Sequence, residues 1–318
     1  MPERPEGCFA QRFLTPFPDF FKRLIVGILE SFKKLFTKRP KGSLKRIDVA
    51  KRFELIGRTG QGSMSKVWRA RDREIGKIVC LKVLDKEKTR RFDARFPALT
   101  KPSEGAICVQ LRHKNIVQTF EHGLTMQGEP YLVMELIEGT GLNFLIETNS
   151  KMLEGNRISI LTQLADAIEY VHKANFLHRD ICPRNIMVTS ECRVKLIDFG
   201  LTIPFRPEFC KPGNRTGTPN YLAPELIKRT TTDNRVDLFA LGVTAYEVFT
   251  GSLPWEKAES LQTLLSHMNS AGRSPLNFQP DLDARTAKLL VKAVERNPAD
   301  RFQSAEEFRE ALKTLPKQ

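Results

Sequence analysis

Two short stretches of this chain carry side chains that could hold a metal ion beside a reacting hydroxyl. The first runs from His178 to Asn185 and includes Asp180, and the second begins at Asp198, thirteen residues after Asn185. Carboxylate and amide oxygens are the ligands that Mg²⁺ prefers. Phosphoryl transfer asks a protein for positioning, metal clamping and a base-like carboxylate rather than covalent chemistry, so these residue types are what that reaction needs.

A glycine-containing turn lies well before these stretches, between two strand-like runs. Its candidate residues are Gly60, Gly62, Ser65 and Val67. Glycines let a hairpin pass close over phosphates with its backbone amides pointing inward. Ser65 stands where a third glycine would complete the pattern. A glycine turn between strands is more often only a turn, so this motif is weak evidence by itself.

Lys82 lies inside an apolar run that also contains Cys80. A lysine in such a strand is costly unless its ammonium finds a partner. Glu104, at the start of the next predicted helix, is the candidate partner, and the pair would hold the ammonium against phosphate oxygens. Two ordinary alternatives stay open: Lys82 could reach water from an edge strand, and Glu104 could be a solvated carboxylate at a helix start.

The elements that must position these residues fall into two groups along the chain. Period-two runs predict strands at 53–57, 65–72, 77–84, 116–120 and 131–136. Helical periodicity predicts helices at 103–111, 157–174, 237–249, 286–295 and 305–315. We therefore expect an α+β fold with a small β-rich lobe followed by a larger helical lobe.

Residues 1–40 differ in composition from the rest and read as a basic amphipathic leader. Apolar residues recur at helical spacing over 19–37, and lysines and arginines lie mostly off that stripe. Residues 41–52 are expected to be a linker. The leader helix could lie on an anionic membrane surface, or its apolar stripe could pack on a partner protein or on the rest of the chain.

Composition limits the function classes. The chain has 318 residues and a net charge of +14, and residues 1–52 hold 13 Lys/Arg against 5 Asp/Glu. No basic helix is interleaved with base-reading residues, so nucleic acid is an unlikely partner. The six cysteines show no metal-binding or disulfide spacing, and no apolar run is long enough to span a bilayer. We expect a cytoplasmic protein, at most peripheral at a membrane.

Together, the motifs resemble those of the eukaryotic-type Ser/Thr protein kinase family, including its bacterial members, from about Phe53 to Leu315. They arrive in family order: the glycine loop at 60–67, Lys82, Glu104, 178–180, 198–200, 217–225, 237–242 and Arg301. The resemblance implies a bilobal fold with an N-lobe at 53–137 and a C-lobe at 138–315. It also implies ATP and Mg²⁺ as cofactors and protein Ser/Thr hydroxyls as substrates.

The resemblance also assigns roles. Asp180 would accept or orient the proton of the substrate hydroxyl, Asn185 and Asp198 would ligate Mg²⁺, and Glu104 would hold Lys82 against the α- and β-phosphates. The backbone of Glu135 to Ile137 would bind the adenine edge, with Met134 behind it. The remaining nucleotide contacts would come from Gly60, Gly62, Ser65, Val67, Cys80 and Met187.

Cys182 departs from the family pattern, which usually has a lysine at this position to neutralise charge on the transferred phosphoryl group. Arg184, just before Asn185, is the expected substitute cation. The sequence therefore predicts an active kinase. The alternative is a nucleotide-binding pseudokinase that acts as a scaffold.

Other motif residues predict scaffolding and regulation. We expect Glu225 to pair with Arg301, and Asp237 to hold the backbone around His178. Thr216 is the expected autophosphorylation site on the activation segment, residues 201–222. We expect no sensor domain after residue 315, so any regulatory input would come through the leader or through a separate partner.

Overall fold

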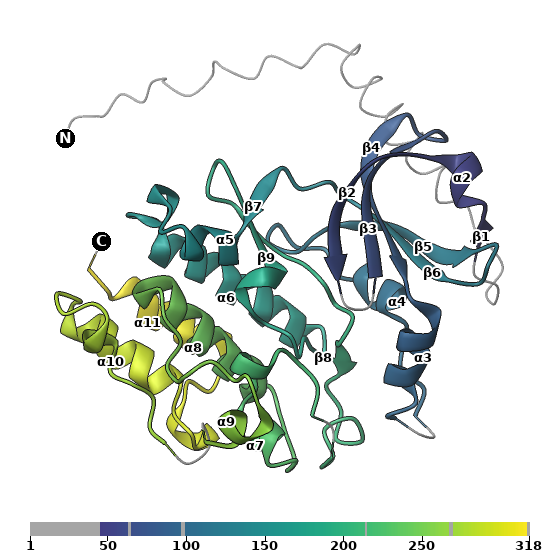
Figure 1. Cartoon of the computed structure of the whole chain (residues 1–318). Helices are drawn as coiled ribbons and strands as arrows, with labels where there is room; N and C mark the ends of the chain where they lie inside the picture. The colour runs from purple at the N-terminus through teal and green to yellow at the C-terminus, as the bar shows by residue number, and fades with distance from the viewer. Residues whose placement is uncertain (1–44, 63–64, 97–98, 214, 267–269, 317–318) are drawn as a thin grey trace, which may run out of the picture. The chain divides into compact units, whose positions relative to one another are not determined.

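A computed structural model describes residues 45–62, 65–96, 99–213, 215–266 and 270–316 of the chain. The leader helix predicted at 19–37 lies outside these residues. Strands dominate the first part of the described chain and helices the second (Figure 1). This arrangement confirms the predicted α+β fold with a β-rich N-lobe and a helical C-lobe. No helix among the described residues is long and apolar enough to cross a membrane.

The N-lobe is built on a six-stranded sheet. Its strand order is β1-β5-β6-β4-β3-β2, and all neighbours are antiparallel except the parallel pair β1 and β5. The strands are β1 (Arg46–Ile47), β2 (Phe53–Gly62), β3 (Ser65–Asp72), β4 (Lys77–Leu84), β5 (Thr119–Thr125) and β6 (Pro130–Met134). One face carries a small apolar core that includes Phe53, Leu81 and Val133. The helices of this lobe are α2 (Val49–Arg52), α3 (Lys86–Asp93) and α4 (Glu104–Cys108).

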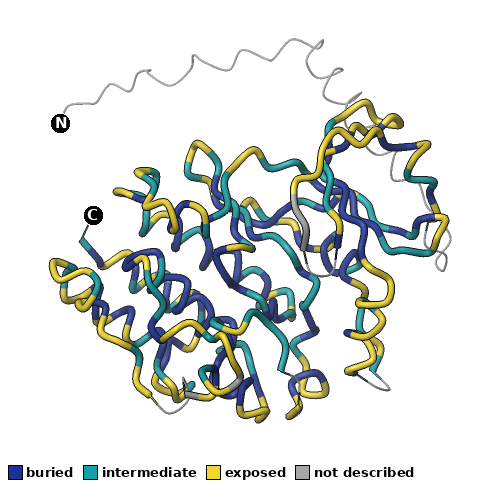
Figure 2. The backbone as a smooth tube through the Cα atoms, in the orientation of Figure 1, coloured by how far each residue is buried: buried dark blue, intermediate teal, exposed yellow. Residues whose placement is uncertain are grey.

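The C-lobe is organised around α8 (Arg235–Thr250), which is buried along nearly its whole length (Figure 2). A helix that is apolar on all sides needs neighbours on all sides. At Gly242 an added Cβ would lie 2.5 Å from the backbone oxygen of Ala293, so the glycine permits a close approach of α10. The other helices are α5 (Leu142–Glu147), α6 (Arg157–Lys173), α7 (Pro224–Ile227), α9 (Leu261–Ser266), α10 (Ala284–Ala293) and α11 (Ala305–Lys313).

Short strands in the described part of the C-lobe form two small sheets, and the loops that connect these strands carry candidate site residues. The first group is β7 (Gly139–Gly141), β9 (Ile186–Thr189) and β10 (Val194–Leu196), and the second is β8 (Phe176–Leu177) with β11 (Ile203–Pro204). The segment between β8 and β9 contains Asp180, and Asp198 follows β10. Asn185 and Asp198 are the two metal-binding candidates, and they lie next to the paired strands β9 and β10, Asn185 directly before β9 and Asp198 just after β10.

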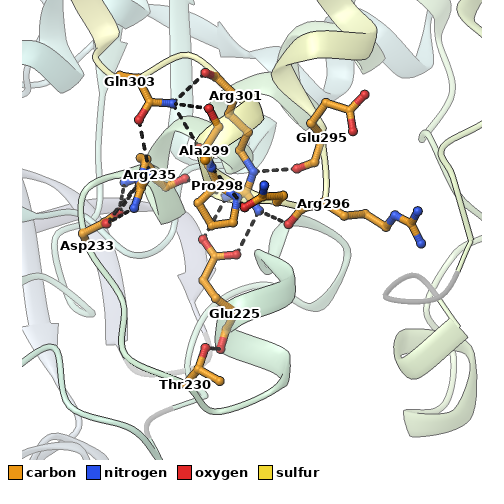
Figure 3. A network of polar contacts seen from close by, with 11 residues as sticks. Glu225, Thr230, Asp233, Arg235, Glu295, Arg296, Pro298, Ala299, Arg301 and Gln303 are labelled. Carbon is orange, nitrogen blue, oxygen red and sulfur yellow. Dashed lines mark hydrogen bonds and ion pairs between the residues drawn. The ribbon is translucent and has the colours of Figure 1, made fainter.

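The predicted pairing of Glu225 with Arg301 is present. Two guanidinium nitrogens of Arg301 donate to the two carboxylate oxygens of Glu225 at 2.8 and 2.9 Å, and the same guanidinium donates to the backbone oxygens of Glu295 and Arg296 (Figure 3). The Arg301 side chain is fully buried. Removing one member of such a pair leaves a buried charge unpaired, which costs about 3–5 kcal/mol. The contact is therefore part of the scaffold.

The prediction of a linker at 41–52 is wrong for residues 46–52. Residues 46–52 form β1 and α2, and Asp48 caps α2 by accepting from the backbone nitrogens of Ala50 and Lys51. Arg52 at the end of α2 is buried and pairs with Asp72 and Glu121. Since a buried guanidinium needs these partners, the segment belongs to the N-lobe.

Three further differences between the predicted and the observed elements lie between β4 and β6. Helix α3 was not predicted, and α4 ends at Cys108, with the amides of Gln110 and Leu111 bonding three residues back rather than four. The strand predicted at 116–120 begins only at Thr119. Ile116 instead bridges to Leu196 of the C-lobe, and the Val117 nitrogen donates to the Leu196 oxygen at 3.0 Å.

Candidate active site

The carboxylate of Asp237 holds the loop that carries Asp180. This carboxylate accepts hydrogen bonds from the backbone nitrogens of His178 and Arg179, both at 2.8 Å, and contacts His172 Nε2 at 2.9 Å. Arg179 has a φ of +71°, a backbone conformation that side-chain-bearing residues rarely adopt. The Asp237 carboxylate supplies the contacts that stabilise this turn, as the sequence predicted for a scaffold residue.

Both carboxylate oxygens of Asp180 accept hydrogen bonds. The Thr218 nitrogen and hydroxyl donate to Oδ1 at 2.8 and 2.7 Å, and Asn185 Nδ2 donates to Oδ2 at 2.9 Å. Asn185 Nδ2 also donates to the Asp180 backbone oxygen at 2.8 Å. These contacts fix the carboxylate beside the start of the 217–225 motif. Gly217 makes this approach possible, because a Cβ there would lie 2.8 Å from the Arg179 oxygen.

Asp198 lies next to Asn185 because their backbones are tied together. The Ile197 nitrogen donates to the Asn185 oxygen at 2.9 Å. Asp198 Oδ1 accepts from the Gly200 nitrogen at 3.1 Å, which stabilises an Asp198 φ of +62°. The ring of Phe199 packs edge-on against His178 with centroids 4.7 Å apart. The two predicted metal ligands are thus neighbours.

Lys82 has two carboxylate partners. Its Nζ lies 2.7 Å from Glu104 Oε1 and 2.9 Å from Asp198 Oδ1. Burial alone would lower the pKa of Lys82, but Asp198 and Glu104 outweigh it and raise that pKa above its ordinary value. Burial would likewise raise the pKa of Asp198, yet Lys82 holds it below its usual range. The ammonium therefore stays charged beside an ionised Asp198.

Asn185 and Asp198 offer a donor set that fits Mg²⁺. Both Asn185 hydrogen bonds to Asp180 use the amide nitrogen, which leaves the amide oxygen for another partner. The Asp198 side chain is 40% exposed, so solvent can reach it. An amide oxygen beside a carboxylate matches the oxygen ligands of this ion.

Cys182 and Arg184 both reach Thr218. The Cys182 sulfur lies 3.7 Å from Thr218 Oγ1, and Arg184 Nη2 donates to the same oxygen at 3.3 Å. Burial and the nearby Asp180 carboxylate raise the pKa of the Cys182 thiol to about 11, so it is neutral near pH 7. Among these three side chains only Arg184 brings positive charge next to Asp180.

A hollow opens beside these groups. Its lining includes Ser65, Lys82, Glu104, Asp180 and Asp198. The residues expected around the adenine ring, Val67, Cys80, Glu135, Ile137 and Met187, do not line this hollow. The sheet register places Cys80 opposite Met134, and Gly60 and Gly62 opposite Val67 and Ser65.

Glu135 has contacts that the sequence did not predict. Its backbone nitrogen donates to the Gln118 oxygen at 2.9 Å, and its carboxylate accepts from the Gln118 nitrogen and from Lys195. The Glu135 amide is therefore engaged within the protein. An adenine edge at this position would depend on the Glu135 carbonyl and on Ile137.

The sequence reasoning also missed two charged residues that line the hollow. Lys101 and Asp93 both line it and lie 3.3 Å apart, and the Lys101 side chain is only 6% exposed. Each looks like an ordinary surface residue in the sequence. The apolar spacing of Phe92, Phe96 and Leu99 was the available signal, and it went unused because no helix was predicted at 86–93.

Comparison with known proteins gives consistent matches. The family described as "Protein kinase domain" matches residues 53–313. A probable serine/threonine-protein kinase of Clostridium perfringens is 32% identical over 85% of this chain and 39% of its own length. A serine/threonine-protein kinase of Myxococcus xanthus is 31% identical over 85% of this chain and 51% of its own length. Serine/threonine-protein kinase PknA of Mycobacterium tuberculosis is 30% identical over 84% of this chain and 62% of its own length. The chain thus spans between about two fifths and three fifths of these relatives.

Proposed function

Since the chain belongs to the protein kinase family, we propose that it transfers the γ-phosphate of ATP to Ser/Thr hydroxyls of proteins. The observation that carries the proposal is the pairing of Lys82 with both Glu104 and Asp198, at 2.7 and 2.9 Å. A buried lysine between two carboxylates is poorly explained as an edge-strand residue. It is well explained as a cation that takes phosphate oxygens as ligands.

The proposed steps use the side chains of this chain in defined positions. Asp180 orients the substrate hydroxyl and receives its proton, and Thr218 and Asn185 hold the Asp180 carboxylate for that task. Lys82 binds the α- and β-phosphates. Asn185 and Asp198 would hold Mg²⁺, which when bound supplies positive charge to the phosphate oxygens.

Arg184 takes the part of the missing lysine in this proposal. Its guanidinium shares the Thr218 hydroxyl with Asp180, so it lies where charge develops on the transferred phosphoryl group. The Cys182 thiol is neutral and cannot replace it. Removing a cation that acts mainly in the transition state costs on the order of 10²-fold in kcat.

Transfer of labelled γ-phosphate from ATP with Mg²⁺, to the protein itself and to a generic basic substrate, tests the proposal. We expect transfer by the wild type, none by Asp180→Asn, and a loss of on the order of 10²-fold in kcat for Arg184→Ala. Arg184→Lys keeps the charge and should recover part of the rate.

The variants separate the two parts of the proposal. Full activity of Arg184→Ala would reject Arg184 as the substitute cation while keeping the enzyme. Wild-type protein that binds ATP but transfers nothing, either before or after pre-incubation with ATP, would contradict the proposed activity.

The proposal also covers the cellular location of the protein and the contacts of its leader. The scattered cysteines in the sequence favour the cytoplasm. The amphipathic pattern of residues 1–40 favours contact with an anionic membrane surface or with a partner protein, and the two differ in their response to vesicles and salt.

A further inference from the structure

Five cations form a basic face on the activation segment and on the loop that follows α7. Its members are Arg206, Lys211, Arg215, Lys228 and Arg229. Arg215 is half-buried and the other four are exposed. Among the described residues, no carboxylate forms an ion pair with any of the five. Charges of one sign on neighbouring loops add up to a field that attracts anions.

The carboxylates of the same stretch of chain do not neutralise the basic face. Residues 201–233 contain three carboxylates, at Glu208, Glu225 and Asp233. Glu225 is bound to the buried Arg301, and Asp233 pairs with Arg235 at 2.6 Å. Within residues 201–233, Glu208 is therefore left to offset five cations.

Backbone contacts bring the parts of the basic face together. The Thr232 nitrogen donates to the Cys210 oxygen at 3.0 Å, which places the loop after α7 beside Lys211. The Phe209 nitrogen donates to the Arg206 oxygen at 3.0 Å, so Arg206 lies in the adjoining turn. These cations thus come from segments that lie side by side.

The basic face begins next to the catalytic carboxylate. Thr218, three residues after Arg215, donates to Asp180 through its nitrogen and its hydroxyl. Because three residues of chain span at most about 11 Å, Arg215 lies within that reach of Thr218. Arg184 donates to the Thr218 hydroxyl at 3.3 Å. A substrate hydroxyl at Asp180 therefore has cations on the neighbouring surface.

The surroundings of the basic face favour a protein segment over a membrane or a nucleic acid. The exposed large apolar side chains of the described residues all lie outside 201–233. An interfacial membrane site uses apolar side chains that enter the lipid, and single-stranded nucleic acid uses aromatic rings on which its bases stack. Carboxylates of a protein substrate need neither, because charge complementarity guides them.

We propose that the basic face selects protein substrates that carry Asp or Glu close to the Ser or Thr that is phosphorylated. Arg215 is the specificity-determining residue nearest the reaction, and the same charges repel basic segments. The selected carboxylates lie within about three residues of the acceptor, since that length of chain covers the distance to Arg215. The inference rests on the proposed kinase function and names its substrate class.

The experiment compares three peptides of identical sequence around one Ser, with Glu, Gln or Lys at the flanking positions. The full chain is given each peptide with ATP and Mg²⁺, and the ratio of the kcat/KM values is measured, which does not depend on the fraction of active enzyme. Since exposed ion pairs are individually weak, several together should favour Glu over Gln on the order of tenfold at low salt. The ratio should fall towards one as added salt screens the charges.

Charge-reversal variants locate the preference. Arg215→Glu and Lys211→Glu should each bring the Glu-to-Gln ratio towards one and make the Lys peptide a better substrate than it is for wild type. Lys151→Glu and Lys288→Glu are the matched controls, because both lysines are exposed and neither pairs with a carboxylate of the described residues. They change the net charge equally and should keep the wild-type ratio. If Arg215→Glu does not fold, Lys211→Glu decides.

Peptide binding gives a readout that does not depend on catalysis. The Glu and Gln peptides, with Ala in place of the Ser, are titrated with phosphatase-treated protein and followed by fluorescence anisotropy. The treatment removes any phosphate on the activation segment, which would compete for the same cations. The Glu peptide should bind wild type more tightly than the Gln peptide does, and Arg215→Glu and Lys211→Glu should lose that difference.

Three results would overturn the inference. The Glu-to-Gln ratio could be near one at low salt, or the control variants could lower it as much as Arg215→Glu and Lys211→Glu do. In the third, those two variants weaken binding of an oligouridine but not of the Glu peptide, which would assign the basic face to nucleic acid. If neither the peptides nor the protein itself is phosphorylated, the proposed function fails, while the anisotropy titration still decides whether an acidic segment is selected.

Discussion

Thr218 contacts both Cys182, which departs from the family pattern, and Arg184, the expected substitute cation. Its hydroxyl donates to Asp180, accepts from Arg184 and lies near the Cys182 sulfur. Positions 182 and 184 both reach this hydroxyl, since the Cys182 sulfur lies 3.7 Å from it and Arg184 donates to it at 3.3 Å. Because Arg184 is bonded to it, the loss of a lysine at 182 need not remove positive charge from this point.

Thr216, two residues earlier, gives a prediction at the same scale. Phosphorylation adds close to two negative charges, and Arg206, Lys211 and Arg215 make the activation segment basic. We expect purified Thr216→Ala to show a lower initial rate of phosphate transfer than wild type pre-incubated with ATP. Wild type treated with a phosphatase is the matched control and should fall to the rate of the variant. Equal initial rates for all three samples would contradict the prediction.

At the scale of elements, residues 45–52 form a strap that closes one edge of the N-lobe sheet. Strand β1 pairs with β5, and Arg52 donates to Asp72 and Glu121 while Tyr131 also donates to Glu121. Burial alone would raise the pKa of Glu121, but the hydrogen bonds from Arg52 and Tyr131 lower it from 4.5 to about 2. The strap is therefore held partly by an ionised carboxylate.

The sign of the pH dependence follows from this lowered pKa. A carboxyl group whose pKa is lower in the folded state stabilises the protein above its unfolded pKa of 4.5, and the contribution is lost as the pH falls towards about 2. We expect Glu121→Gln to reduce the free energy of unfolding by roughly 2 kcal/mol near pH 7. The difference from wild type should shrink below pH 4.5.

Urea unfolding between pH 7 and pH 3 measures this difference. Glu74→Gln is the matched control, because Glu74 also contacts Arg52 but its side chain is 55% exposed. Exposed ion pairs contribute little, so this variant should stay within about 1 kcal/mol of wild type. A gap between Glu121→Gln and wild type that does not change with pH would contradict the assignment.

The same elements show what could be predicted from the sequence. Strands β3 and β4 and helix α6 follow from local periodicity, and Lys82, Asp180 and Asp198 from motif order. The strap could not be predicted, because Arg52 is charged and its partners lie 20 and 69 residues away. Helix α3 has mostly polar residues, and its buried Phe92 packs on Phe96 in a cluster that also contains the distant Phe209.

At the scale of the whole molecule, the described residues connect the lobes at several points. The Asn115 oxygen accepts from the Leu196 nitrogen, and Glu135 after β6 pairs with Lys195 of β10. These contacts link the N-lobe to β10, the strand that Asp198 follows. Movements of one lobe should therefore affect the site through more than the chain connection alone.

The leader adds a second large-scale feature, and its charge allows a direct test. Residues 1–52 hold 13 Lys/Arg against 5 Asp/Glu, and anionic lipid attracts each basic residue near its surface by about 1 kcal/mol. We expect the full chain to sediment with phosphatidylcholine vesicles that contain phosphatidylserine at low salt. Binding should weaken as salt is added and disappear when residues 1–40 are deleted.

The deletion is informative because it leaves the strap in place. Ile47 and Arg52, which join β1 and α2 to the N-lobe, remain in the shortened chain, so its thermal unfolding midpoint should match that of the full chain. Vesicles of phosphatidylcholine alone separate charge attraction from apolar insertion. If the shortened chain still binds, the rest of the protein supplies the charge. If the full chain does not bind the vesicles at low salt, we would assign the apolar stripe of the leader to contact with a protein surface. Such a contact would bury the stripe away from water.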